Sequence, residues 1–362
     1  MRIPVIATSL VKFGDLWEKG IGDLMMESGE MALRNARLKP GMVDSLHIAN
    51  AFSQEMCSAI AYEKLGIINS VSVNAADASG AVAIREASNS ILSGQSNVAM
   101  ALGVEKMADF KSNEILAMTS KLLDNEEFFA GATVQSQFAV MTKKYLNDFG
   151  LKAEDLWFVP SKNHQNGIGN EYAQYRFELK QEKISSSPLA ADPIRMFECA
   201  PYCDGAAALI MCSPRAARKF KAKGYLLASS VASGSSGLSK RKSLTSIEST
   251  KNAAEQAYHA AGIGPKDIGL AEVHDIVPIS EVLAIEDLGF AKKGAGLSYI
   301  KSNSGKINLS GGLKACGNAP GATGVRQAVD VLRRLKSSKL KYGLAQTLAG
   351  TGSISVVNIF GG

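Results

Sequence analysis

The chain has 362 residues, more than a single hydrophobic core usually supports, so two domains or a duplicated fold are expected. Its composition is that of a globular protein, 46% hydrophobic and 20% charged, with a net charge of +6. No block of basic residues is interleaved with aromatics, and no run of about 20 apolar residues occurs, which argues against nucleic-acid binding and a membrane span.

The five cysteines set a further limit. Their number is odd, no CxxC pair occurs, and Cys199 and Cys203 lack a second pair of ligands at zinc-binding spacing. We therefore expect no metal site. The N-terminus shows no targeting segment, so the sequence predicts a cytoplasmic protein with reduced thiols.

An apolar strand is expected at residues 3–9, and after it a helix, a breaker and a strand occur twice in the same order. The two sets align without gaps, with Pro40 opposite Pro265 and Ile48 opposite Val273. Apolar spacing predicts the helices, and short apolar runs predict the strands. The first set lies at 20–36, 39–41 and 43–49, and the second at 249–261, 264–266 and 268–273.

The following unit repeats as well. A short strand at 70–73 leads through small residues into a helix at 81–92, and Ile307 to Gly312 leads in the same way toward a helix at Ala322. Strands that alternate with helices imply crossover connections and parallel sheets. The sequence therefore predicts a duplicated α/β fold. The strands that close these units are expected at 97–103 and 341–347.

We expect the first half to span residues 1–220 and the second 221–362. Inside the first half lies an irregular stretch, about 105–195, which holds some helical segments and the polar run Ser161 to Asn166. We interpret this stretch as an insertion that covers a site, not as a third domain. Its helical segments are expected at 113–123 and 135–149.

The turn before the helix at 81–92 is the first candidate for chemistry. Its small residues let another group approach the backbone, and the first helical turn offers free N–H groups at the positive end of the helix dipole. A nucleophile placed there would be activated. The centre of the turn is Asp77, whose carboxylate is a poor nucleophile toward thioesters.

One of the four histidines is also a candidate. His274 ends a predicted strand and is followed by Asp275, just before a helix expected at 280–288. Open α/β sheets bind their ligands at the carboxyl ends of strands, which favours a functional role for His274. His47 and His259 fall inside predicted elements and are expected to be structural.

Two glycine-rich runs could bring the backbone close to a reacting group. Ser310 to Gly324 ends at a helix start and matches neither common nucleotide-binding pattern. Gly350-Thr-Gly352 lies between two predicted strands. The longest basic run, Lys240-Arg241-Lys242, is either a solvated loop or a phosphate contact.

Together these residues resemble the thiolase family. Gly311 to Gly324 resembles the thiolase loop GGxxxxGHPxGATG, and Asn74 to Gly80 resembles the nucleophile turn ACASG. His274-Asp275 resembles the HD motif of sterol-carrier-protein-type and archaeal acetoacetyl-CoA thiolases. Lys162 to His164 and Ser187 to Ala208 match too, so that the resemblance covers essentially the whole chain.

The resemblance implies a duplicated thiolase-like fold, with two βαβαβαββ halves stacked as five αβαβα layers. It also implies an acetyl-CoA C-acyltransferase-type site in which coenzyme A or an acyl-CoA is substrate or ligand, without a covalently bound cofactor. The coenzyme is expected to meet Lys240, Arg241 and Ser243, and the site loops at Gly317 and Gly350. Family members are usually homodimers or homotetramers, and several in this branch work with a small zinc-ribbon/OB-fold partner.

The sequence departs from the family pattern at the reactive positions. Asp77 stands where the family has its acyl-accepting cysteine, and Asn318 stands where it has the histidine that activates that cysteine. The turn Gln346 to Gly352 lacks the family's cysteine base. His274 remains as an oxyanion-type donor, and Cys316, two residues from Asn318, is a candidate replacement for a lost group.

Three functions follow. In the first, the chain is an enzyme that performs a retro-aldol, aldol or decarboxylation-type step on CoA thioesters, with Asp77 as general base and His274 as carbonyl polariser. Alternatively, it is a non-catalytic thiolase-like subunit that binds acyl-CoA or scaffolds a partner enzyme, with Asp77 as a fixed anion that fills the site. In the third, Asp77 is an engineered replacement in an ordinary acetyl-CoA C-acetyltransferase, which leaves Asn318 and the missing C-terminal cysteine unexplained.

Overall fold

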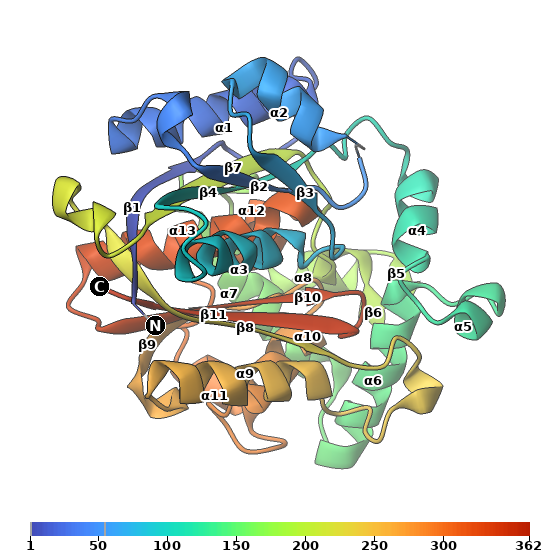
Figure 1. Ribbon diagram of the computed structural model, residues 1–362. Coiled ribbons are helices and arrows are strands. Elements are labelled where there is room, and N and C mark those ends of the chain that lie inside the picture. The colour runs from blue at the N-terminus through green and yellow to red at the C-terminus, as the bar shows by residue number, and fades with distance from the viewer. Residues whose placement is uncertain (1, 54–55) are drawn as a thin grey trace.

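The computed structural model describes residues 2–53 and 56–362, which form five stacked layers (Figure 1). Two outer layers of helices enclose two layers of strands, and a pair of helices fills the space between the strands. The duplicated, five-layered α/β fold expected from the sequence is confirmed. The outer helices are α1 (Ile21–Ala36) and α2 (Cys57–Leu65) on one side and α9 (Glu248–Ala261), α10 (Pro278–Asp287) and α11 (Gly296–Ser302) on the other; the central pair is α3 (Ser79–Leu92) and α13 (Pro320–Ser337).

The strands of the two halves follow the same spatial order. In the first half the order is β3-β2-β4-β7-β1, and in the second Ile307 bridges to Ala271 of β9, which continues as β9-β10-β11-β8. β3 in the first half and the Ile307 bridge in the second therefore lie at the two outer edges of the sheet. The first strands of the two halves, β1 and β8, lie next to each other in its middle. The strands are β1 (Ile3–Leu10), β2 (Ser45–Ala49), β3 (Ser70–Val73), β4 (Val98–Glu105), β7 (Gly205–Cys212), β8 (Gly224–Ser233), β9 (Ile268–Glu272), β10 (Tyr342–Ala349) and β11 (Ile354–Gly361).

The parallel pairs determine where the loops of the site lie. β2 runs parallel to β3 and β4, and β10 runs parallel to β9, whereas the other pairs are antiparallel. The carboxyl ends of the parallel strands of one half therefore meet at one edge of its sheet. The start of β1 pairs with β8, with Ile3 opposite Leu226, and this contact joins the two sheets into one nine-stranded arrangement.

The central helices touch each other through glycines. A Cβ at Gly80 of α3 would lie 2.7 Å from the Gly321 carbonyl oxygen, and a Cβ at Gly324 of α13 would lie 2.3 Å from the Ala81 nitrogen. Any larger residue at either position would push α3 and α13 apart. This close contact holds the start of α3, just after Asp77, against the start of α13.

The insertion between β4 and β7 is more regular than the sequence suggested. The polar run Ser161 to Asn166, which we interpreted as part of an irregular stretch, lies in a helix, α7. The division into halves at residue 220 stays a prediction. The insertion contains α4 (Ser112–Ser120), α5 (Asn125–Phe129), α6 (Val134–Phe149), α7 (Phe158–Gly167), α8 (Gln181–Ser185) and the ribbon of β5 (Leu189–Ala191) and β6 (Ile194–Arg195).

Across residues 2–53 and 56–362, no helix combines the length and apolar character needed to cross a membrane.

Candidate active site

Asp77 lies in the turn between β3 and α3, and the neighbouring residues fix the path of this turn. Ala76 adopts a positive φ of 50°, and its N–H donates to Asn74 Oδ1 at 3.0 Å. The Ser79 hydroxyl accepts from the Ala75 N–H at 2.8 Å and donates to the Ala76 carbonyl. A non-glycine residue in this conformation is strained, which is typical of functional turns. The Asp77 side chain is buried, with 5% of its surface exposed.

The partner of the Asp77 carboxylate comes from the other half of the chain. Asn318 Nδ2 donates to Asp77 Oδ1 at 2.9 Å, and Asn318 Oδ1 accepts from the Thr323 hydroxyl at 2.7 Å. Burial raises the pKa of Asp77 to about 6, although the hydrogen bond from Asn318 acts in the opposite direction. Asp77 therefore titrates close to neutral pH, in the range that suits a general base.

The backbone of Asn318 is held by the segment that follows the insertion. The Asn318 N–H donates to the Pro201 carbonyl at 2.7 Å, and the Asn318 carbonyl accepts from the Cys203 N–H at 3.0 Å. Tyr202, between these two residues, forms a parallel bridge with Asn318. The turn of Asp77, the glycine-rich loop of Asn318 and this segment thus form one compact unit.

His274 follows the carboxyl end of β9, where the sequence predicted it. Its N–H donates to Gln346 Oε1 at 3.0 Å, and its carbonyl accepts from the Ser280 hydroxyl at 2.9 Å. Burial, together with the positive charge of Arg326, lowers the pKa of His274 to about 3, so the imidazole is neutral at physiological pH. A neutral imidazole still donates one hydrogen bond, and Nδ1 has no hydrogen-bond partner within the described residues.

Asp275 ties the glycine-rich loop to the end of β9. Its carboxylate accepts from the Leu313 N–H at 2.6 Å and from the Lys314 N–H at 3.2 Å, both in the short helix α12 (Gly312–Cys316). A Cβ at Gly312 would lie 2.3 Å from this carboxylate, so only glycine fits there. The sequence of the loop is therefore explained by the close approach of Asp275.

The surroundings of Asp77 and His274 are linked through one backbone segment. The Ala200 N–H donates to the Ile276 carbonyl at 2.9 Å, two residues after His274, and the Pro201 carbonyl accepts from Asn318. The predicted site residues Asp77, Asn318 and His274 therefore belong to loops that meet along residues 200–203.

Cys316 lies in the same loop but differs from an activated thiol. Its Sγ donates to the Ser310 carbonyl at 3.3 Å, and burial raises the pKa of the Cys316 thiol to about 12. Such a thiol is protonated at neutral pH and is a weak nucleophile. Its role as a replacement nucleophile stays a prediction.

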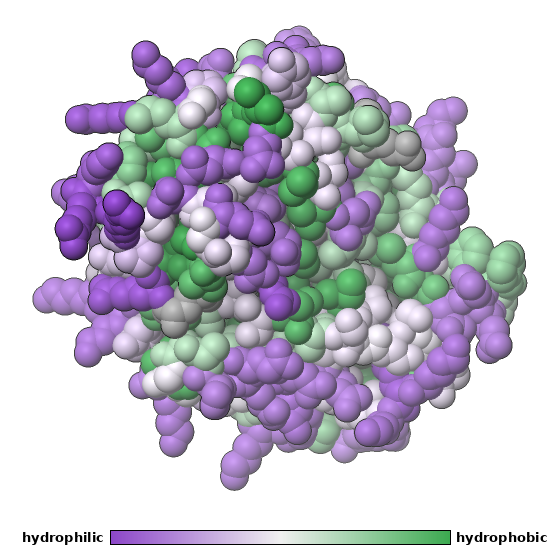
Figure 2. Space-filling model, viewed as in Figure 1, coloured by the Kyte–Doolittle hydropathy of each residue, from purple (hydrophilic) through white to green (hydrophobic). Residues whose placement is uncertain are grey.

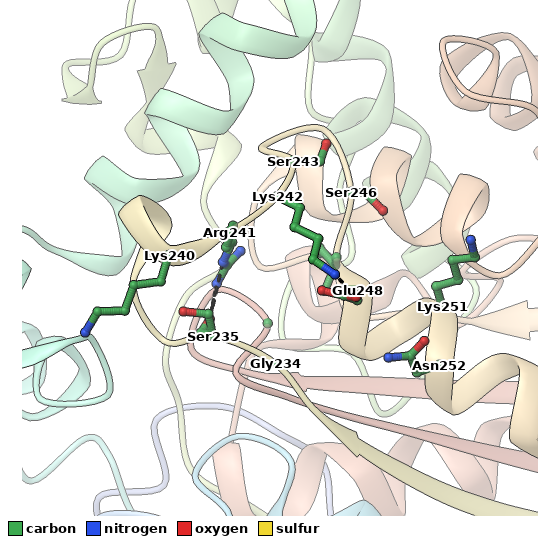
Figure 3. Close-up of a pocket in the computed structure, with 12 residues that line it drawn as sticks. Gly234, Ser235, Lys240, Arg241, Lys242, Ser243, Ser246, Glu248, Lys251 and Asn252 are labelled. Carbon is green, nitrogen blue, oxygen red and sulfur yellow. Dashed lines mark hydrogen bonds and ion pairs between the residues drawn. The ribbon is translucent and has the colours of Figure 1, made fainter.

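Three of the residues predicted to contact the coenzyme line one surface pocket of about 240 Å³, shown in Figure 3. Lys240, Arg241 and Ser243 lie on the loop between β8 and α9, and Gly352, from the turn after β10, also lines the pocket. Lys251 of α9 adds another positive charge. The pocket is therefore basic and polar.

The basic side chains of this pocket are engaged to different degrees. Lys240 extends away from its neighbours in Figure 3 and forms an ion pair with Asp124. The Arg241 guanidinium donates to the Thr351 carbonyl and hydroxyl, both at 2.9 Å, so that it holds the turn between β10 and β11. Lys242 and Lys251 are exposed. Lys242 Nζ lies 4.0 Å from Glu248 Oε1, a loose contact between two exposed side chains, so that both lysines can still meet an anion.

Gly317 and Gly350, the two glycines predicted to contact the coenzyme, are not among the residues that line this pocket. Gly317 adopts a φ of 93°, and a Cβ there would lie 2.4 Å from Cys203 Sγ. Gly350 starts the turn after β10 with a φ of 56°. Both glycines adopt positive φ values that allow their loops to turn. Contact with a coenzyme stays a prediction for each.

A second pocket, of about 460 Å³, is mostly apolar and lies on the insertion side. Ile115 and Leu116 of α4 line it together with Met196 and Tyr202. Figure 2 shows apolar side chains gathered around α4 and α5 at the right of the view. Tyr202 lines this pocket and also interacts with the reactive centre. Burial raises the pKa of its phenol, and the nearby charge of Asp77 raises it further.

Two residues of the site, Thr323 and Glu105, were not among those predicted from the sequence. Glu105, at the end of β4, accepts from the Ala51 N–H at 2.8 Å in the first half and from the Gly321 N–H at 2.9 Å in the second. An acidic residue at the carboxyl end of a buried strand was the available signal for Glu105. Thr323 offered no such signal, because its role depends on the direction of the Asn318 amide.

Comparison with known proteins agrees with this architecture. The family model for the thiolase N-terminal domain matches residues 3–215, and that for the thiolase C-terminal domain matches residues 230–362. Among curated proteins, the chain is 36% identical to an acetyl-CoA acetyltransferase of Methanocaldococcus jannaschii, over 99% of this chain and 98% of that protein. It is 29% identical to human sterol carrier protein 2, over 99% of this chain and 72% of the relative.

Solved structures share the fold at lower sequence identity. A chain of the Ltp2-ChsH2(DUF35) aldolase superposes with a TM-score of 0.85 at 18% identity, over 99% of this chain and 97% of that one. Human mitochondrial 3-ketoacyl-CoA thiolase superposes with a TM-score of 0.82 at 17% identity, over 99% and 98% of the two chains. On the matches of both family models and of relatives along its whole length, this chain belongs to the thiolase family.

Proposed function

We propose that this chain binds CoA thioesters and that Asp77 acts as a general base in a carbon–carbon bond step that does not pass through an acyl-enzyme. The observation that carries the proposal is the buried Asp77–Asn318 pair, with the pKa of Asp77 raised to about 6. A base with such a pKa is half ionised near pH 6 and mostly ionised at pH 7.5.

The chemistry of a carboxylate argues against acyl transfer through Asp77. Attack of a carboxylate on a thioester gives a mixed anhydride, which water hydrolyses. That Asp77 stands where the family has its acyl-accepting cysteine is part of the proposal. Asn318 supports it, because an amide cannot take the proton that a histidine would take from a thiol.

The step that fits best is a retro-aldol cleavage of a 3-hydroxyacyl-CoA. Asp77 would take the proton of the 3-hydroxyl group while the bond between C2 and C3 breaks. The released electron pair forms the enolate of the thioester, whose oxygen a neutral His274 would stabilise by a hydrogen bond. A proton then returns to C2, giving an acyl-CoA and a ketone or aldehyde.

The two pockets suggest how such a substrate is divided. Lys242, Ser243 and Lys251 line the basic pocket, where the phosphates of coenzyme A would find charge and hydrogen bonds. Ile115, Leu116 and other apolar residues line the second pocket, which suits an apolar acyl group. We assign the coenzyme to the first pocket and the acyl group to the second.

A non-catalytic subunit is the second candidate, and the closed state of the centre favours it. Asp77 is 5% exposed, His274 1% and Asn318 0%. In this function the chain would bind acyl-CoA or hold a partner enzyme without turnover. A small zinc-ribbon/OB-fold partner belongs to this proposal, and so does a cytoplasmic location; the name of the solved DUF35 aldolase gives a reason to search for the partner.

Titration calorimetry with coenzyme A and acetoacetyl-CoA, each sample followed by intact-mass analysis, tests the proposal together with a panel of 3-hydroxyacyl-CoA substrates. We expect binding without a covalent adduct, cleavage of a 3-hydroxyacyl-CoA, and a rate that rises with pH through about 6. D77N should lower that rate by at least about 100-fold while binding is retained.

The exposed carboxylate of Glu63 provides the matched control, because E63Q removes the same kind of charge on the surface. An acyl adduct on the wild-type protein would contradict a mechanism without an acyl-enzyme. Cleavage that D77N leaves unchanged would refute Asp77 as the base. Binding without turnover of any substrate in the panel would favour the non-catalytic subunit.

A further inference from the structure

The interaction of Asp77 with Asn318 depends on the direction of an amide. Asn318 can present either its NH₂ group or its oxygen to the carboxylate, and only the NH₂ group stabilises an ionised Asp77. The backbone of Asn318 is fixed on both sides by Pro201 and Cys203. Rotation of the side-chain amide is therefore the freedom that remains.

Thr323 determines which end of the amide faces Asp77. Its hydroxyl lies 2.7 Å from Asn318 Oδ1 and 3.1 Å from the Ala319 carbonyl oxygen. A hydroxyl has one proton, so a full hydrogen bond to one acceptor leaves the other without it. When the proton points to Asn318, the amide oxygen is held at Thr323 and the NH₂ group is held at Asp77.

The opposite arrangement is consistent only with a protonated Asp77. If the Thr323 proton pointed to the Ala319 carbonyl, the hydroxyl oxygen would accept from Asn318 Nδ2. Asn318 Oδ1 would then face Asp77, where it needs a carboxylic acid as donor. The shorter distance to Asn318 favours the first arrangement.

We propose that Thr323 is a positioning residue that fixes the Asn318 amide as a donor and thereby keeps Asp77 in its base form. The inference rests on the proposed role of Asp77 as a base. Thr323 is fully buried, at 0% exposure, so water does not compete for its hydroxyl. Nothing in the sequence pattern alone assigns this role, since it depends on which end of the Asn318 amide faces Asp77.

The other groups that act on Asp77 are Glu105 and Tyr202. The negative charge of Glu105 adds to the effect of burial, and the pKa of the half-buried Tyr202 is itself raised further by Asp77. The hydroxyl of Thr323 bonds to Asn318 and Ala319 instead of either side chain. A change at Thr323 should therefore alter the pKa of Asp77 through Asn318, with Glu105 and Tyr202 as a constant background.

The test measures the ionisation of Asp77 directly, by carbon NMR of protein labelled in its aspartate carboxyl groups; D77N identifies the resonance. T323V keeps the shape of the side chain and removes the hydroxyl, whereas T323S keeps the hydroxyl. We expect the pKa of Asp77 to rise by about one unit in T323V, which lowers the ratio of ionised to protonated Asp77 roughly tenfold at equal pH, and to stay near the wild-type value in T323S.

An unchanged pKa of Asp77 in folded T323V would overturn the proposal, and so would an equal rise in T323S. If T323V does not fold, T323A removes the same hydroxyl and is compared with T323S in the same way. Because the readout is a carboxyl resonance, it is independent of turnover. Absence of catalysis would count against the proposed function and leave this measurement intact.

Discussion

Burial makes the ionised form of Asp77 costly for the folded protein. Its pKa is about 6 in the folded state against 3.8 for an ordinary aspartate. The folded protein therefore binds a proton more tightly than the unfolded chain between these values, and stability falls as pH rises from about 4 to about 6. Above pH 6 the full penalty is present, about 3 kcal/mol by the difference in pKa.

D77N should remove this penalty and stabilise the protein at neutral pH. We expect the thermal unfolding midpoint of D77N to exceed that of the wild type by several degrees at pH 7.5, because the introduced amide is neutral and its oxygen still accepts from Asn318. The gain should disappear near pH 4, where Asp77 is protonated in the folded wild type. Scanning calorimetry at the two pH values checks this, and a midpoint of D77N below wild type at pH 7.5 would contradict it.

The residues of the site were only partly predictable from sequence. Asp77, Asn318 and His274 could be named because their positions match a family motif. Their charge states could not, because they depend on burial and on neighbours far away in the chain, such as Arg326 beside His274. The role of Thr323 depends on a hydrogen-bond direction, which no spacing in the sequence encodes.

At the scale of elements, the contact between α3 and α13 positions the two halves of the site. The starts of both helices carry glycines that allow backbone to touch backbone. Asp77 lies two residues before α3, and Asn318 lies two residues before α13. The distance between the helices therefore fixes the distance between the two side chains.

A methyl group at this contact should disturb both stability and the site. G324A places a Cβ 2.3 Å from the Ala81 nitrogen, and we expect a loss of about 1–3 kcal/mol in the free energy of unfolding. G305A is the matched control, because nothing lies within 4 Å of a Cβ at Gly305. Denaturant unfolding of both variants measures the effect; equal stability of G324A and wild type would show that the helices can separate without cost.

The elements themselves were largely predictable, since their periodicity repeats in both halves. The polar run Ser161 to Asn166 shows why one helix, α7, was not predicted. Two of its polar side chains are buried against partners, with Lys162 Nζ 2.6 Å from Glu281 Oε1 and Asn163 Nδ2 2.7 Å from Asp275 Oδ2. Sequence polarity gave no indication of a helix, whereas buried partners from α10 and from the segment just after β9 hold one.

At the scale of the whole molecule, one edge of the nine-stranded sheet is open to another chain. β3 lies at that edge, and Val71 within it is 47% exposed. Ile68, just before the strand, is 86% exposed. An edge strand with exposed apolar side chains is a template for pairing, which agrees with the expectation of a homo-oligomer.

We expect the chain to form a dimer through β3. The double substitution I68K/V71K should shift the sedimentation coefficient to that of a monomer, because like charges would face each other across the symmetric contact. M42K changes another exposed apolar residue and serves as control. A wild-type monomer, or a dimer that persists in the double variant, would exclude this interface.

The shared central layer has a consequence for biosynthesis. The inner face of the first sheet packs against α13, which begins only at Pro320. A ribosome therefore releases the strands of the first half, together with α3, well before the helix that completes their core. During that interval the nascent chain exposes the apolar surface that α13 later covers, and aggregation competes with folding until α13 has left the ribosome.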